Sequence, residues 1–310
     1  MKFKLLIFAI VASLSMSCFT ACNEEDPIVT PVVKKTIVDV VVADANFSFL
    51  KAAVIAAGLD KTLAETPNLT VFAPTNQAFK NAGFKDEAAV SAADKATLVS
   101  ILSYHVYPVK TLAADIKTAD NQALEMFSKI KAYLTKNAGG VSINGAKVTT
   151  ADVAADNGVI HVIDAVLSVP GKNIVELVVA NPNLSLLKAA VLRANEGSTK
   201  VVTILSGTGP FTVFAPTDAA FKKAGFDEAK IKTTDPDFLA KVLTLHVVGA
   251  RVFSTNLVDG FVKSVQGGDL LIKGATVKGP ANSTESIING VNIISTNGVV
   301  HTIDAVLLPN

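Results

Sequence analysis

The sequence predicts an α+β protein that is built from two copies of one domain. Two motifs recur in the same order, because Val71–Thr75 reappears as Val213–Thr217, and His161–Leu167 reappears with one substitution as His301–Leu307. The offsets are 142 and 140 residues, far longer than the roughly 20–50 residues of a solenoid repeat. Each copy is therefore expected to be a domain with its own core. Helical patterns come early and strand patterns late in each copy, which argues against a doubly wound parallel sheet.

Length and charge set the broad class of the protein. The 310 residues, half of them hydrophobic, provide room for two domains of about 100–150 residues each. The 28 lysines and arginines nearly balance the 27 aspartates and glutamates, and no dense basic run occurs. Nucleic-acid binding is therefore not expected, since it depends on a basic surface.

The N-terminus has the pattern of a processing signal. Lys2 and Lys4 precede the apolar stretch Leu5–Leu14, which is too short to span a bilayer. Cys18 and Cys22, the two cysteines of the chain, follow at once, so no disulfide is expected in the downstream domains. The segment resembles a bacterial lipoprotein signal, in which a lipidated cysteine becomes the first mature residue.

Cys22 is the expected lipidation site, because the small Ala21 precedes it and the polar Asn23–Asp26 follows. Cys18 remains an alternative, as does an ordinary secretory peptide that is cleaved beyond both cysteines. The acidic segment resembles the tether that sends Bacteroidetes-type lipoproteins to the outer face of the outer membrane. Several acyl chains, at about 0.8 kcal/mol per buried CH₂, would hold the protein there stably. The expected location is therefore the outer membrane, with the domains lipid-anchored at the cell surface.

The chain divides into a signal peptide (residues 1–21), a tether (22–33), copy one (34–168) and copy two (171–310). Each copy opens with a helix, for which Thr36 and Asn173 are the expected N-caps. A second helix is expected to follow in each copy. The short break between the copies indicates that the two domains touch.

Strand and turn signals follow these helices. Leu69–Ala73 and Phe211–Ala215 are rich in β-formers and end at a proline, which predicts a strand in each copy and a short helix after it. Val141–Val148 alternates apolar and polar residues around an Asn-Gly pair, which predicts a hairpin. Asn157 and Asn297 each begin a further Asn-Gly turn before the last strand.

These blocks make the chain resemble tandem fasciclin-type domains. The matching motifs are Thr70–Phe79, Tyr104-His105 and Asn157–Leu167 in copy one, and Thr212–Phe221, Leu245-His246 and Asn297–Leu307 in copy two. The resemblance covers the chain from about residue 34 to its end. It implies two β-wedge domains with helices packed on the sheets, and a role in adhesion or extracellular binding rather than catalysis. Copy two departs from the pattern by having Leu245 where the family has tyrosine.

The first histidine of each copy, His105 or His246, continues the apolar stripe of a helix. The residues alone favour a buried imidazole that bonds to backbone, since an unpaired buried polar group costs about 1–3 kcal/mol. The family resemblance implies receptor binding near the Tyr-His motif. Tyr104, His105 and, by position, His246 are therefore candidates for contact with a partner.

The second histidine of each copy, His161 or His301, begins a strand that is apolar on both faces and so buried. Asp164 lies three residues after His161, on the opposite face of the strand, so the two cannot form a dyad within it. No metal site and no cofactor are predicted. The chain also lacks a Gly-x-Ser-x-Gly elbow, a His-Glu-x-x-His helix and a phosphate-binding glycine loop, so no enzymatic activity is expected.

Asp152-Val153 aligns with an Asp-Ile pair that resembles an integrin-recognition motif in animal relatives. A loop carboxylate of this kind completes the coordination of a divalent ion held by the receptor. The alternative is a solvated turn acid. Asn292 takes the place of the acid in copy two.

Two functions are weighed. The first is an anchored surface module that binds a protein or extracellular-matrix partner. The alternative is a lipoprotein that binds a glycan or another small ligand for nutrient capture. Sugar stacking favours tryptophan and tyrosine, but the chain has no tryptophan, and Tyr104, Tyr107 and Tyr133 all lie in copy one. A purely architectural spacer is a third possibility.

Overall fold

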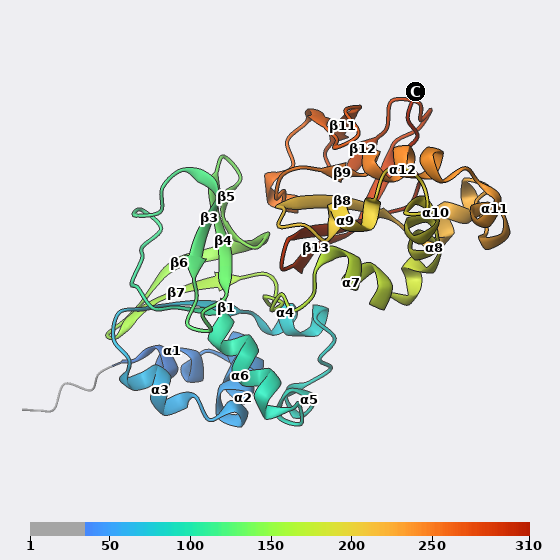
Figure 1. The fold of residues 1–310 in the computed structure, drawn as a ribbon. Coiled ribbons are helices and arrows are strands. Elements are labelled where there is room, and N and C mark those ends of the chain that lie inside the picture. The colour runs from blue at the N-terminus through green and yellow to red at the C-terminus, as the bar shows by residue number, and fades with distance from the viewer. Residues whose placement is uncertain (1–34) are drawn as a thin grey trace, which may run out of the picture. The chain divides into compact units, whose positions relative to one another are not determined.

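The computed structural model describes residues 35–310, which form one compact unit. The signal peptide, the tether, Cys18 and Cys22 lie outside the described residues. Each copy carries one seven-stranded sheet, and helices α1, α2, α3 and α6 of copy one gather on one side of theirs (Figure 1). The predicted α+β class and the tandem arrangement are confirmed.

Most of the helices lie in the first half of each copy, as predicted. In copy one they are α1 (Ile37–Ala43), η1 (Ala45–Phe47), α2 (Ser48–Ala57), α3 (Asp60–Glu65), α4 (Asn76–Asn81), α5 (Glu87–Ser91) and α6 (Lys95–Tyr104). In copy two they are α7 (Ile174–Ala180), η2 (Pro182–Leu184), α8 (Ser185–Ala194), α9 (Val201–Leu205), α10 (Asp218–Lys223), α11 (Glu228–Thr233), α12 (Pro236–Leu245) and η3 (Ser254–Asn256).

The strands cluster late in each copy, apart from one early strand and its short neighbour. In copy one they are β1 (Leu69–Pro74), β2 (Val106–Tyr107), β3 (Ala119–Glu125), β4 (Lys131–Asn137), β5 (Gly140–Ile143), β6 (Ala146–Ala155) and β7 (Gly158–Ile163). In copy two they are β8 (Phe211–Pro216), β9 (Val247–Val248), β10 (Gly260–Lys263), β11 (Asp269–Lys273), β12 (Thr276–Lys278), β13 (Ser286–Ser295) and β14 (Gly298–Ile303).

Both sheets have the same topology. The strand order in copy one is β2-β1-β7-β6-β5-β4-β3, and copy two repeats it as β9-β8-β14-β13-β12-β11-β10. The early strand and the last strand of each copy pair in parallel, β1 with β7 and β8 with β14, while the other pairs are antiparallel. The first and last motifs of the repeat therefore lie side by side in the interior of each sheet, next to the short edge strand β2 or β9.

Local sequence signals explain where the helices begin. Thr36 and Asn173 each cap the first helix of a copy and form a capping box with an acid three residues later. Thr75 and Thr217, which end the Phe-Ala-Pro-Thr block, cap α4 and α10 through their hydroxyls. The threonine of this motif is thus the N-cap of the helix that follows.

Each sheet separates two cores. On one face of the copy-one sheet, the helices pack around Phe49, Leu50 and Leu98. The other face packs around Phe72, Tyr104 and Met126, and we call it the wedge side. Copy two repeats both cores.

Asn157, the first residue of the Asn-Gly motif, ties three segments together. Its Oδ1 accepts a hydrogen bond from the N–H of Ile37 at 2.8 Å, while its Nδ2 donates to the carbonyls of Leu63 and Thr66 at 2.7 and 3.0 Å. Gly158 follows because a Cβ there would lie 2.1 Å from the Leu69 carbonyl oxygen. In copy two, Asn297 makes the same bonds to Ile174, Leu205 and Gly207.

The two copies contact each other, as the short break between them predicted. The guanidinium of Arg251 lies over the ring of Tyr133, 4.1 Å from its centroid, and Phe253 packs beside the same ring. Asn121 Nδ2 donates to the Arg251 carbonyl at 2.7 Å, and Asn256 Nδ2 donates to Thr135 Oγ1 at 3.1 Å. The loop before β10 therefore rests on strands of copy one.

The tie at Asn157 is expected to support the stability of copy one. Asn157→Ala leaves part-buried donors and acceptors unpaired, so the free energy of unfolding should fall by about 2–4 kcal/mol. Tyrosine fluorescence during urea unfolding reports on this copy, because all three tyrosines lie in it and the chain has no tryptophan. Asn81→Ala, at an exposed position, is the control and should change stability by less than about 0.5 kcal/mol. Equal effects of the two substitutions would contradict the assigned role.

Candidate functional site

His105 and His246 each bridge two backbone segments. His105 Nδ1 lies 2.8 Å from the carbonyl oxygen of Ile101 in α6, and its Nε2 accepts a hydrogen bond from the N–H of Leu167 at 2.9 Å. His246 repeats both contacts with Val242 and Leu307 at 2.8 and 2.9 Å. Only a neutral imidazole with its proton on Nδ1 satisfies both partners. Each ring joins the end of a helix to the segment after the last strand.

His161 and His301 hold a second pair of segments in the same way. His161 Nε2 lies 3.0 Å from the Thr111 carbonyl oxygen, and its Nδ1 accepts from the N–H of Asp152 at 3.2 Å. His301 bonds to the Val252 carbonyl at 2.9 Å. The ring of Phe72 packs against His161, with 5.6 Å between centroids. All four histidines are buried and bonded to backbone groups, as the apolar patterns around them predicted.

Burial lowers the pKa of three histidines, His105, His246 and His301. Loss of hydration lowers the pKa of His105 and of His246 to about 4, although the hydrogen bonds to Ile101 and Val242 oppose the shift. Burial also lowers the pKa of His301, against the opposing effect of the Val252 carbonyl. These rings therefore act as fixed hydrogen-bonding groups near neutral pH.

Tyr104 is a core residue with no exposed surface. Its hydroxyl donates to the Lys131 carbonyl and accepts from Asn144 Nδ2, both at 2.9 Å. Burial raises the pKa of Tyr104 to about 12, and the bond from Asn144 opposes the shift. Leu245 fills the matching buried position in copy two, where a hydrocarbon needs no hydroxyl partner.

Three of the four residues predicted to contact a partner are buried in this structure. Tyr104, His105 and His246 are at most 2% exposed, so none of the three reaches a partner on the surface of this structure. Asp152 does remain exposed, and its Oδ1 accepts from the N–H of Ala113 at 2.8 Å. The structure also brings Asp152 to 4.0 Å from His161 Nδ1. This proximity could not be predicted from the sequence, because it arises from the pairing of β6 with β7.

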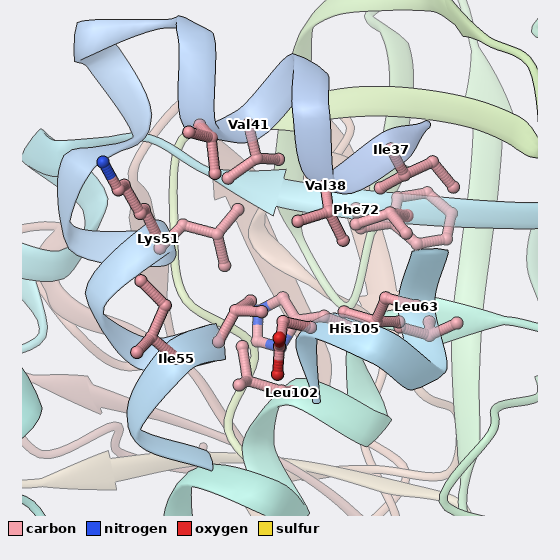
Figure 2. Close-up of a pocket in the computed structure, with 15 residues that line it drawn as sticks. Ile37, Val38, Val41, Lys51, Ile55, Leu63, Phe72, Leu102 and His105 are labelled. Atoms are coloured by element: carbon pink, nitrogen blue, oxygen red, sulfur yellow. The ribbon is translucent and has the colours of Figure 1, made fainter. Parts of the chain in front are cut away.

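An apolar pocket opens between the helices of copy one (Figure 2). Its cavity measures about 40 Å³, and Val38 and Val41 of α1 face Leu102 of α6 across it. His105 lies at its base, and Lys51 of α2 stands at its edge (Figure 2). Two large aliphatic side chains of the lining remain exposed, Val42 at 46% and Ile55 at 59%.

Copy two has a pocket at the matching place, with a cavity of about 80 Å³. Its lining residues are Val175, Val178, Val179, Lys188, Val191, Leu192, Val202 and Leu205. Each has a counterpart in the copy-one lining, in order Val38, Val41, Val42, Lys51, Val54, Ile55, Asp60 and Leu63. The exposed pair recurs as Val179 at 49% and Leu192 at 56%. We call these two sites the paired pockets.

Sequence reasoning missed the paired pockets, although a signal was present. Ile37–Ala43 and Ile174–Ala180 are apolar at all but one position each, Asp39 and Glu176. A helix that packs one stripe against a sheet needs only part of its circumference to be apolar. The surplus valines were therefore an indication of a second apolar surface.

The rims of the paired pockets carry different charges. Among residues 35–310, the ion pairs involve neither Lys51 nor Lys188. Asp60 stands at the rim of the copy-one pocket, where copy two has Val202. The copy-two pocket thus has a lysine as its charged residue, and the copy-one pocket has a lysine and a carboxylate.

A second kind of cavity lies on the wedge side of copy one. It measures about 370 Å³ and combines the apolar Phe72 and Leu134 with the polar Tyr107, Asp115 and Lys117. This volume lies within the range of small-molecule sites, about 300–1,000 Å³. We call it the Tyr107 cleft.

Within residues 35–310, no group of His, Cys, Asp and Glu side chains is arranged to hold a metal ion. No single helix in this part of the chain has the length and hydropathy to cross a membrane, although two sharply bent helix pairs have them when each pair is taken together.

The fold and the repeated motifs place the chain in a known family. Residues 45–170 and 185–309 each match the Fasciclin domain family. The chain belongs to this family and contains two fasciclin domains in tandem. The resemblance drawn from the sequence motifs is thereby confirmed.

Proteins similar to this chain come from animals and from a mycobacterium. Transforming growth factor-beta-induced protein ig-h3 of Sus scrofa is 28% identical over 246 residues, covering 78% of this chain and 35% of that protein. Cell surface glycolipoprotein MPB83 of Mycobacterium bovis is 37% identical over 132 residues, covering 42% of this chain and 57% of that protein. A FAS1 domain pair from the insect cell adhesion molecule Fasciclin I matches 84% of this chain and 95% of its own, at 20% identity and a TM-score of 0.40. The chain spans about a third of the length of the first of these relatives.

The buried histidines are expected to make the protein acid-sensitive. Because the pKa of His105 and His246 is about 4 in the folded state and about 6.5 in an unfolded chain, the unfolded state binds protons first as the pH falls. Their contribution to stability is therefore complete above about pH 6.5 and is lost progressively down to about pH 4. The loss is on the order of 3 kcal/mol per histidine.

This dependence is measured by urea unfolding at several pH values between 7.5 and 4. The double variant His105→Gln, His246→Gln should show a shallower fall of unfolding free energy over that range, whatever its stability at pH 7.5. Histidine C–H resonances provide an independent readout, since those of His105 and His246 should stay at the neutral position down to about pH 4.5. Titration of these resonances near pH 6.5 would show that the rings are not held neutral.

Proposed function

We propose that this protein is a surface adhesion module whose two fasciclin domains bind a protein or extracellular-matrix partner. The single observation that carries the proposal is the retention of the paired pockets, with exposed aliphatic rims, at matched positions of two diverged copies. Isolated exposed aliphatic residues are ordinary on protein surfaces. A repeated apolar hollow with an exposed rim is instead typical of interaction sites. The related cell surface glycolipoprotein supports the same function.

Adhesion is tested with residues 34–310 on an array of matrix proteins and glycans. If the paired pockets bind the partner, Ile55→Glu with Leu192→Glu should reduce binding to the recognised component at least tenfold, because a carboxylate at each rim opposes burial. The matched control is Val109→Glu with Val258→Glu, which also adds one acid to an exposed aliphatic position in each copy. Equal loss in both double variants, or no binding to any protein component, would contradict the proposal.

Asp152 is a further candidate for partner contact. Its carboxylate is exposed on a bulge of β6, where its backbone φ is +60°, and Asn292 has the same φ in copy two. Asp152→Asn therefore installs the residue that copy two tolerates at this position. On the same array, loss of divalent-dependent binding in this variant would assign the carboxylate to a receptor-held ion.

The Tyr107 cleft favours a second candidate function, the binding of a glycan or another small ligand. In copy two, Val248 and Val258 stand where copy one has Tyr107 and Lys117. Two polar residues of the cleft, Tyr107 and Lys117, are thus specific to copy one. Binding to glycan spots of the array that Tyr107→Val removes, while protein binding persists, would identify the cleft as a ligand site.

We propose that the protein is anchored to the outer membrane through a lipidated Cys22, with its domains at the cell surface. The support comes from the sequence pattern around Cys22 and from the name of the related cell surface glycolipoprotein. In cells supplied with labelled palmitate, the wild type should carry the label and be found in the outer-membrane fraction. The Cys22→Ser variant should lose both the label and its place in that fraction. Retention of label by this variant but not by Cys18→Ser would assign the anchor to Cys18 instead.

A further inference from the structure

The paired pockets are too small for most ligands. An engineered cavity of about 150 Å³ holds one benzene molecule, whereas these cavities measure about 40 and 80 Å³. They have room for the branched end of an aliphatic side chain, but not for an aromatic ring or a long acyl chain. The size of the pockets therefore points to a peptide segment rather than to a lipid or a small aromatic molecule.

The rims add a requirement for charge. Lys51 and Lys188 are half-buried at the edges of the pockets, and the ion pairs formed by residues 35–310 leave both ammonium groups without a carboxylate. An occupant that places an acid against each lysine gains a charge-assisted hydrogen bond at a partly desolvated site. A neutral or basic occupant leaves that lysine unpaired.

We propose that each of the paired pockets binds one aliphatic side chain of a partner protein, next to an acidic residue whose carboxylate pairs with Lys51 or Lys188. This inference rests on the proposed adhesive function and specifies the chemistry that the partner presents. The apolar part of the contact is common to both copies, since the exposed pairs Val42 with Ile55 and Val179 with Leu192 would be covered together.

The two copies should differ in their preference for acid. Asp60 at the copy-one rim repels a carboxylate that approaches Lys51, while Val202 at the same place in copy two does not. Copy two is therefore the stronger site for an acidic segment. The chain offers its own matched controls, because Asp60→Val gives copy one the copy-two rim and Val202→Asp makes the opposite exchange.

The test uses NMR of residues 34–310 with labelled Ile, Leu and Val methyl groups. The probes are capped tetrapeptides of sequence Gly-Leu-Asp-Gly, Gly-Leu-Lys-Gly and Gly-Ser-Asp-Gly, and vesicles of phosphatidylglycerol. The Leu-Asp peptide should produce saturable shifts at Leu192 and Val179, and weaker ones at Ile55 and Val42. Its affinity should exceed that of the Leu-Lys and Ser-Asp peptides at least fivefold.

Variants then separate the two parts of the contact. Lys188→Gln should remove the preference for the acidic peptide at copy two, and Asp60→Val should raise the copy-one affinity toward that of copy two. Equal affinity for the Leu-Asp and Leu-Lys peptides, no methyl shifts with any peptide, or shifts with vesicles alone would overturn the inference. If binding on the matrix array still depends on Ile55 and Leu192 but not on the lysines, the adhesive function stands and this inference fails.

Discussion

The fold of each copy depends on a neutral imidazole that joins backbone groups from distant parts of the chain. His105 accepts from the N–H of Leu167 and bonds to the carbonyl of Ile101, so the end of α6 and the C-terminal segment of the domain share one ring. If the ring of His105 were protonated to a cation, its Nε2–H would point at the N–H of Leu167, and neither group could accept a hydrogen bond. Burial and geometry therefore impose the same protonation state, and the residues around the ring are constrained to preserve it.

Other motif residues of the family also have structural contacts in this chain. The aromatic residue of the Phe-Ala-Pro-Thr block packs on the second histidine, and the threonine caps the following helix. Asn157 holds α1 and α3 against the start of β7, and Gly158 allows the close approach of β1. These motif residues are thus internal supports of the fold.

The sequence allowed the class, the repeat, the helix caps and the hairpin at Asn144 to be predicted, because each has a local or periodic signal. The buried roles of His105 and His161 followed from their place in apolar stripes. The parallel pairing of β1 with β7 and the proximity of Asp152 to His161 were not accessible, since both arise from contacts across the sheet. The paired pockets were missed because periodicity identifies the face of a helix that is buried, but not a surplus of apolar residues beyond it.

The placement of β7 between β1 and β6 has a consequence for how the protein is made. This interior strand, like β14 in copy two, is the last strand that the ribosome delivers for its domain. Until Gly158–Ile163 emerges, β1 lacks its parallel partner and His161 is absent from the core. Copy one therefore stays open through nearly all of its own synthesis, and long-range pairing of this kind makes closure slow relative to local helix formation.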